Sequence, residues 1–143
     1  MTELKDHGPA PFVTNIEEVT VANDNFRTAL WTGEYFQITL MSIPVGGDIG
    51  LEIHPDTDQF LRLESGRGHV QMGSSQDDLT ILDTEVGDDF AIVIPAGTWH
   101  NVTNIGDEPM KVYSIYAPPH HPHSTVHATQ ADAEAAEAAE HAE

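Results

Sequence analysis

The stretch GGDIGLEIHPDTDQFLRLESG, residues 46–66, decides how this chain is interpreted. Glu52 and His54 stand two residues apart in a short apolar segment, and side chains two apart on a strand point to the same face. The Pro-Asp pair that follows predicts a turn. The chain resumes as a strand in which Gln59 shares its face with the leucines two and four residues further on. If this face lines the same cavity as His54, three metal-capable side chains converge there.

A second stretch, PAGTWHNVTN at residues 95–104, brings His100 out of a Pro-Ala-Gly turn. Together the two stretches resemble the motifs of the cupins, G-x5-H-x-H-x4-E-x6-G and roughly G-x5-P-x-G-x2-H-x3-N. The first motif is met in every spacing by Gly46, Glu52, His54, Gln59 and Gly66. The second is met from its proline onward by Pro95, Gly97, His100 and Asn104. Its leading glycine position holds Asp89, and the nearest glycine is Gly87.

The resemblance implies a divalent metal ion, which the family typically holds with three His and one Glu. The matched positions here are Glu52, His54, Gln59 and His100, so the carboxylate has moved from the third position to the first. Gln59 either binds the metal directly or orients a water. In the second case two His and one carboxylate remain, the pattern of non-haem Fe(II), although Mn, Zn or Ni would also accept these ligands. Asp58 could substitute, but it should face away if Gln59 faces inward.

Many short apolar runs punctuated by Gly and Pro predict an all-β barrel or sandwich. The resemblance selects the cupin double-stranded β-helix, or jelly-roll, barrel. We predict a lead-in over residues 1–11, a barrel over 12–117 and a tail over 118–143. The strands are expected at residues 12–16, 26–32, 35–43, 59–63, 69–72, 79–82, 89–94 and 110–117. In small cupins the first of these often crosses to a partner subunit, so the resemblance implies a homodimer.

The tail is Pro- and His-rich over residues 118–123 and Ala- and Glu-rich from residue 128 onward. Clustered His can bind metal, but the prolines and the lack of acidic partners favour adventitious binding over a designed site. The Ala/Glu stretch is helix-prone but has no large apolar residue to dock it. We therefore expect a disordered or partly helical acidic tail.

The composition restricts the partners of this 143-residue chain, which has 39% hydrophobic residues and is long enough for one cored domain. It has no Cys and a net charge of −19, which opposes binding to nucleic acids and to anionic membranes. Five of the 24 acidic residues lie in the tail, and the 19 others still far outnumber five basic residues. This bias favours adaptation to high salt over an ordinary acidic protein. No apolar signal core is present, so a cytoplasmic protein is expected.

The leading functional hypothesis is a metal-dependent enzyme, an oxidoreductase or isomerase, that acts on a small oxygenated molecule. Dioxygenase, isomerase and lyase chemistry are all compatible with the ligands, and no separate catalytic base can be identified. The alternatives are a non-catalytic module that binds a carbohydrate or other small molecule, and a structural dimer with a relic site. Proteins that look like this are often labelled mannose-6-phosphate isomerase-like. A phosphosugar needs further cations, however, and Arg62 is predicted to face away, Arg67 lies in a turn and Arg27 cannot be placed.

Overall fold

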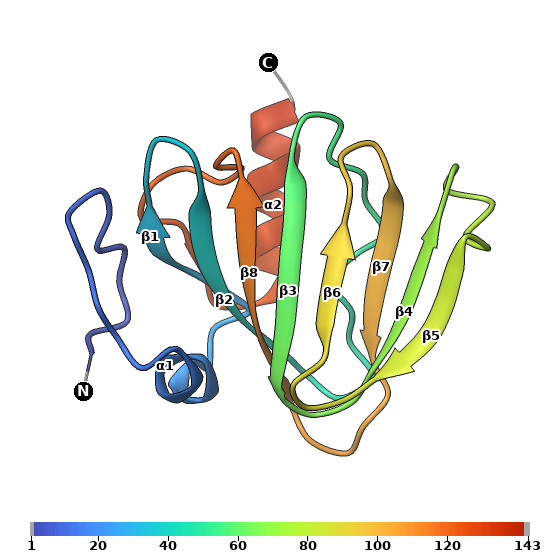
Figure 1. The fold of residues 1–143 in the computed structure, drawn as a ribbon, viewed down its shortest axis with the longest axis horizontal. Coiled ribbons are helices and arrows are strands. Elements are labelled where there is room, and N and C mark those ends of the chain that lie inside the picture. The colour runs from blue at the N-terminus through green and yellow to red at the C-terminus, as the bar shows by residue number, and fades with distance from the viewer. Residues whose placement is uncertain (1, 142–143) are drawn as a thin grey trace.

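The computed structural model describes residues 2–141, and within them the chain forms nine strands and two helices (Figure 1). The helices are α1 (Ile16–Ala22) and α2 (Gln130–His141). The strands are β1 (Arg27–Thr32), β2 (Gln37–Ile43), β3 (Asp58–Ser65), β4 (Gly68–Gly73), β5 (Leu82–Val86), β6 (Ala91–Ile94), β7 (Trp99–Asn104), β8 (Met110–Ala117) and β9 (Val126–His127).

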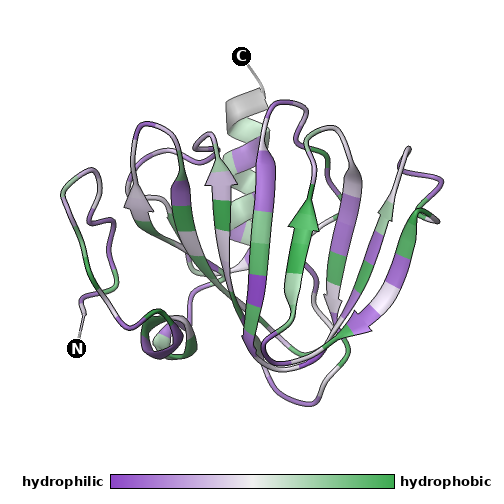
Figure 2. Ribbon diagram, viewed as in Figure 1, coloured by the Kyte–Doolittle hydropathy of each residue, from purple (hydrophilic) through white to green (hydrophobic). Residues whose placement is uncertain are grey.

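Two antiparallel sheets enclose the core. The larger sheet has the order β6-β3-β8-β2-β1-β9, and the smaller sheet has the order β5-β4-β7. Along β3 burial alternates from Asp58 to Leu63, as expected for a strand with one buried face, and both hydrophobic and hydrophilic bands are visible on this strand (Figure 2). The main core cluster joins both sheets, with members such as Leu63 and Met41 from the larger and Val70 and Val102 from the smaller. This confirms the predicted all-β jelly roll.

The predicted strand at residues 12–16 is wrong, because the chain enters helix α1 at Ile16 instead. The Asn15 side chain accepts a hydrogen bond from the backbone N–H of Glu18, which caps the helix. The acidic residues in the first turn then stabilise the helix, because their negative charge interacts favourably with the partial positive charge at its N-terminus. Ile16 and Val19, three residues apart, pack with Leu40 on the outer face of the larger sheet. Residues 12–15 therefore lead into this helix and form no strand within the described chain.

Most other predicted strands are confirmed to within two residues, but the one at residues 79–82 is displaced and begins only at Leu82. The cause is local, because the Asp78 carboxylate accepts hydrogen bonds from the backbone N–H and the hydroxyl of Thr80. This side-chain turn competes with strand pairing. Ile81 is consequently 70% exposed, although its apolar side chain had favoured the prediction of a strand at this position.

Asp89 occupies the position at which the second motif has its leading glycine. It is one of two non-glycine residues with positive φ within the described chain, at 68°. Short polar side chains tolerate this left-handed conformation, which otherwise favours glycine. Its carboxylate also accepts a hydrogen bond of 2.8 Å from Arg62. Asp89 thus adopts the backbone conformation expected of the motif's glycine.

The tail folds back onto the barrel, and its predicted partial helicity is confirmed by α2. Strand β9 pairs with β1, and the Gln37 side chain both accepts from the backbone N–H of His121 and donates to its carbonyl oxygen. Ala133 on α2 is 3% exposed and belongs to the main core cluster. A small residue therefore docks the helix, and α2 covers one side of the barrel opening (Figure 1).

Candidate metal centre

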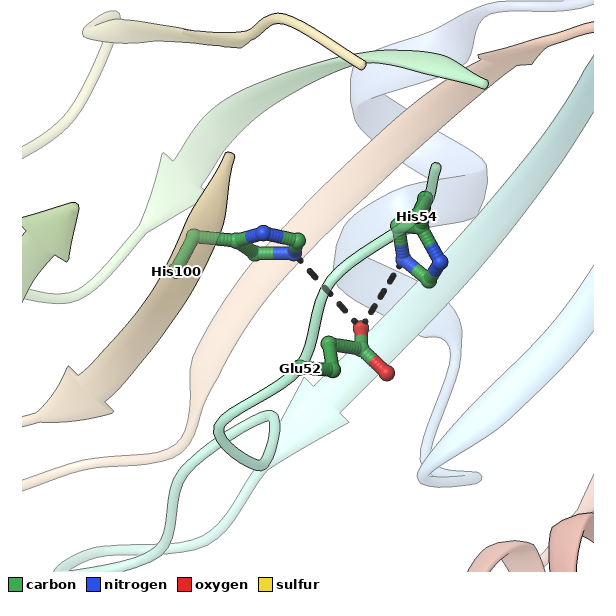
Figure 3. A group of neighbouring side chains, drawn as sticks. All are labelled: Glu52, His54 and His100. Atoms are coloured by element: carbon green, nitrogen blue, oxygen red, sulfur yellow. Dashed lines mark hydrogen bonds and ion pairs between the residues drawn. The ribbon is translucent and has the colours of Figure 1, made fainter. Parts of the chain in front are cut away.

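Glu52, His54 and His100 meet at one end of the barrel. Glu52 and His54 lie in the segment between β2 and β3, and backbone hydrogen bonds of 3.0 and 2.9 Å tie Glu52 to His100 at the start of β7. Glu52 Oε1 lies 3.2 Å from His54 Nε2 and 3.7 Å from His100 Nε2 (Figure 3). The three potential ligand atoms all lie within 4.8 Å of one another. The two motifs thus bring together the three side chains that their spacing singled out.

The orientation of His100 suits a metal ligand. The ring is fully buried, and its Nδ1 lies 2.9 Å from the carbonyl oxygen of Thr98, so that Nδ1 carries the hydrogen and donates it. Nε2 then presents its lone pair to the cluster. Among residues 2–141 this atom finds no hydrogen-bond partner. A backbone carbonyl that fixes one imidazole nitrogen and leaves the other available is typical of metal-binding His.

The charge state of Glu52 suits a cation as well. Burial by itself would raise the pKa of this carboxyl, but the adjacent imidazoles of His100 and His54 hold the pKa well below its usual range. Glu52 is therefore ionised at neutral pH. It supplies one negative charge beside two imidazoles, a donor set that Fe, Mn, Zn and Ni all accept.

Gln59 lies on the inner face of β3, as its alternation with Leu61 predicted. It is 2% exposed, and within the described chain its Oε1 has no hydrogen-bond partner. An unpaired buried oxygen costs about 1–3 kcal/mol, so a donor or a cation is expected beside it. Both roles proposed for Gln59, as a direct ligand and as a residue that orients water, remain compatible with its position. Asp58 faces away, as predicted, and accepts from the backbone N–H of Ala96.

Tyr116 belongs to this end of the barrel and was missed by the sequence analysis. It pairs with Gln59 across β8 and β3, and its ring centroid lies 5.8 Å from that of His54. It is 1% exposed, and burial raises the pKa of its phenol to about 12. The hydroxyl therefore stays protonated. The available signal was register, since Tyr116 shares a face of the closing strand with Ser114 and Val112.

The His-rich tail segment forms a wall of the same site. The His120 ring centroid lies 4.1 Å from that of His54, and the neighbouring His121 is 8% exposed. Burial, with a contribution from the charge of Arg27, lowers the pKa of His121 to about 2, so that its ring is neutral. The sequence could not show whether the tail reaches the barrel opening, and in the structure it does.

Arg27, which could not be placed from sequence, lies beside the cluster. It is 2% exposed and lines a cavity of about 230 Å3 together with Glu52. The other arginines lie elsewhere, as predicted, with Arg62 bound to Asp89 and Arg67 to Glu85. His69, which lies outside both motifs, pairs with Asp83 at the surface. A larger hollow of about 680 Å3 around Arg67 is lined by loops at the opposite end of the barrel, away from this cluster.

The fold and the cluster together define a cupin. The family model for the Cupin domain matches residues 39–116, more than half of the chain, and the protein belongs to this family. Cupins commonly bind metal ions and small molecules and often form oligomers. Within residues 2–141 no helix has both the length and the apolar character needed to cross a membrane.

Two bacillar proteins are closely similar to this chain. YrkC of Bacillus subtilis is 65% identical over 132 residues, which cover 92% of this chain and 70% of YrkC. The crystal structure of BH2720 from Bacillus halodurans is 66% identical, covers 92% of this chain and 98% of that protein, and superposes with a TM-score of 0.90. The structure of TT1209 from Thermus thermophilus shares the fold at 18% identity, with a TM-score of 0.63 over 76% of this chain and 98% of that protein.

Proposed function

We propose that this protein is a metal-dependent cupin enzyme that acts on a small oxygenated molecule, with Glu52, His54 and His100 as metal ligands. The observation that carries the proposal is the convergence of an ionised carboxylate and two imidazoles within 4.8 Å, with Nε2 of His100 left unpaired. Two His and one carboxylate with open positions favour Fe(II). Mn, Zn and Ni remain acceptable to the same donors.

A bound divalent ion supplies Lewis acidity toward a substrate oxygen and, if it is iron, redox chemistry with dioxygen. The chain supplies the surroundings. Tyr116 holds a proton on a buried phenol and can donate it to a substrate oxygen. Gln59 either completes the ligand set or hydrogen-bonds a water, and the rings of His120 and His121 exclude bulk solvent. This arrangement fits an oxidoreductase, isomerase or lyase.

Elemental analysis of the untagged, full-length protein tests the proposal. The tail stays in place because it packs on the site. We expect about one equivalent of Fe, Mn, Ni or Zn per chain, lost in His54→Ala and in His100→Ala. His69→Ala is the matched control, since this His pairs with Asp83 at the surface, and it should retain the metal. A metal-free wild-type protein after purification from metal-supplemented cells would contradict the proposal.

The second candidate is a non-catalytic module that binds a carbohydrate or another small molecule. It is favoured by one observation, namely that Glu52, the carboxylate of the cluster, lies 3.2 Å from His54 and is not free to act as a base if it binds the metal. Ligand binding without any turnover by the metal-loaded protein would favour this candidate. A sugar-phosphate isomerase is the weaker alternative, because one arginine beside the acidic α2 matches a phosphate dianion poorly.

We also propose a cytoplasmic homodimer adapted to high salt. The net charge of −19 supports the salt adaptation. The dimer is best supported by exposed apolar side chains, among them Val93, which lies on the outer face of β6 and is 65% exposed. Light scattering of wild type and Val93→Lys at two salt concentrations tests both points. A monomeric wild type at high salt would contradict the dimer.

A further inference from the structure

The cavity beside the cluster is lined partly by the barrel and partly by helix α2 of the tail. Its volume is about 230 Å3, and its lining includes Arg27 from β1, Glu52 from the cluster, and Ala133 and Glu137 from α2. Pockets for drug-sized ligands typically measure about 300–1,000 Å3. The cavity therefore suits a molecule with only a few carbon atoms, one end of which would face the metal ligand Glu52.

Arg27 is a buried cation without a close anionic partner. Its Nη1 lies 3.3 Å from His127 Nδ1 and 4.0 Å from Glu137 Oε1, and its Nε has no hydrogen-bond acceptor among the described residues. The Phe26 ring covers the guanidinium at 5.4 Å. Buried arginines usually form bidentate bonds to a carboxylate. The donors of Arg27 are only partly used by the protein itself.

The carboxylate of Glu137 lies on the side of Arg27 where a bidentate partner would be expected, but it is too far away for a hydrogen bond. At 4.0 Å it is beyond hydrogen-bond range, and its side chain is 37% exposed, which weakens the ion pair through solvent screening. It sits on α2, which is docked by the small residue Ala133 and by a hydrogen bond from Gln130 to Asp48. A carboxylate from solution that reached Arg27 would thus replace a weak contact with a bidentate one.

The unused donors of Arg27 favour a small acid over a neutral ligand. With a divalent ion present, the ion and Arg27 contribute three positive charges, which balance the three carboxylates of the lining, Glu52, Glu134 and Glu137. A ligand with a carboxylate at one end and a hydroxyl, oxo or second carboxylate oxygen at the other would satisfy Arg27 and reach the metal together. A phosphate dianion would need more donors and would face Glu134 and Glu137.

We propose that Arg27 binds the carboxylate group of a small hydroxy-, oxo- or dicarboxylic acid, and that Glu137 holds this position when no acid is bound. The metal end of this site rests on the proposed function, whereas the Arg27 end does not. Arg27 is thereby a specificity-determining residue, and α2 is the element that must shift when the acid enters.

Titration calorimetry with malonate, a redox-inert dicarboxylate, tests the proposal on the full-length protein in zinc-loaded and metal-free forms. Arg27→Gln should weaken malonate binding about 30-fold or more, the usual effect of losing one member of a buried charge pair. Arg62→Gln is the matched control, because Arg62 lies on the outer face with Asp89, and it should bind like wild type. Equal binding by Arg27→Gln and wild type would overturn the proposal.

Glu137→Gln provides a second test of the proposal, which still applies if Arg27→Gln does not fold. Removal of the competing carboxylate should tighten malonate binding about fivefold, the size expected for a half-exposed ion pair. Unchanged or weaker binding would overturn the proposal. Zinc content, measured on the same samples, separates the two hypotheses. A protein that takes up no zinc on loading but still binds malonate through Arg27 would contradict the metal centre and support the acid site.

Discussion

The interior of the barrel has two ends that are built by the same three strands and differ in chemistry. At the apolar end Met41, Val112 and Leu63 lie side by side across β2, β8 and β3, all almost fully buried. At the polar end, four residues further along each strand, the corresponding row is Gln37, Tyr116 and Gln59. Between them Thr39 and Ser114 pair, and within the described chain neither hydroxyl has a hydrogen-bond partner.

The difference indicates that the apolar end contributes mainly to stability and the polar end mainly to function. The apolar end gains free energy from burial and leaves no polar atom to be satisfied. The polar end buries just as much surface but carries unpaired atoms, including Gln59 Oε1 and His100 Nε2. Such atoms reduce stability unless a ligand satisfies them. The polar end is therefore expected to respond to metal and substrate, and the apolar end is not.

The largest expected effect comes from the apolar end. Leu63→Ala should destabilise the protein by about 3 kcal/mol through lost burial and the cavity left behind. Thermal unfolding should show a midpoint lowered by roughly 10 °C, with or without metal. Ser114→Ala is the comparison in the row next to the polar end, where loss of a hydroxyl without a hydrogen-bond partner among the described residues should cost little. Similar losses for the two variants would remove the distinction between the ends.

The next effect concerns the tail that walls the polar end. Burial lowers the pKa of His121 to about 2, whereas an unfolded His titrates near 6.5. The unfolded chain thus takes up a proton below about pH 6.5 that the folded chain excludes, so stability is full above this pH and falls as the pH drops. We expect a loss of about 2 kcal/mol by pH 4.5. Urea unfolding across this range should show that loss in wild type and a flatter profile in His121→Leu.

Gln59→Leu should raise the stability of the metal-free protein and lower its affinity for the metal. Without metal it removes an unpaired buried oxygen and should stabilise the protein by about 1 kcal/mol. Zinc affinity should fall by about 10–100-fold if Gln59 orients a water and by more if it is a direct ligand. Calorimetry on the metal-free variant measures both quantities. A destabilised metal-free Gln59→Leu would mean that this oxygen is satisfied within the fold.

The smallest effect is expected at Asp89, in the turn that closes the apolar end through its backbone N–H to Leu63. Asp89→Gly relieves the left-handed backbone but loses the pair with Arg62, so unfolding should change by less than about 0.5 kcal/mol. Asp89→Val cannot adopt this conformation easily and should cost about 1–2 kcal/mol. Equal stability of the two variants in urea would argue against the conformational explanation.

Local spacing, through its resemblance to the cupin motifs, was sufficient to predict the barrel and the clustering of Glu52, His54 and His100. Glu52 and His54 lie two residues apart, and the turn before His100 fixes where that ring begins its strand. Tyr116 and Arg27 could not be found in this way, because they reach the site through strand register and through the packing of the tail. Helix α1 was missed because its apolar residues also suit a short strand, and the cap at Asn15 is a weaker signal than hydrophobicity.

The two-residue strand β9 has a consequence for how the molecule behaves in solution. Strand β1 would be the last strand of the larger sheet without it, with backbone donors and acceptors open to any neighbouring chain. Residues 125–127 cover this edge through the pairing of His127 with Arg27 and through the bond from the Ala29 N–H to the Thr125 carbonyl. A protein shortened before this segment is therefore expected to aggregate, and recombinant forms should keep the C-terminal residues.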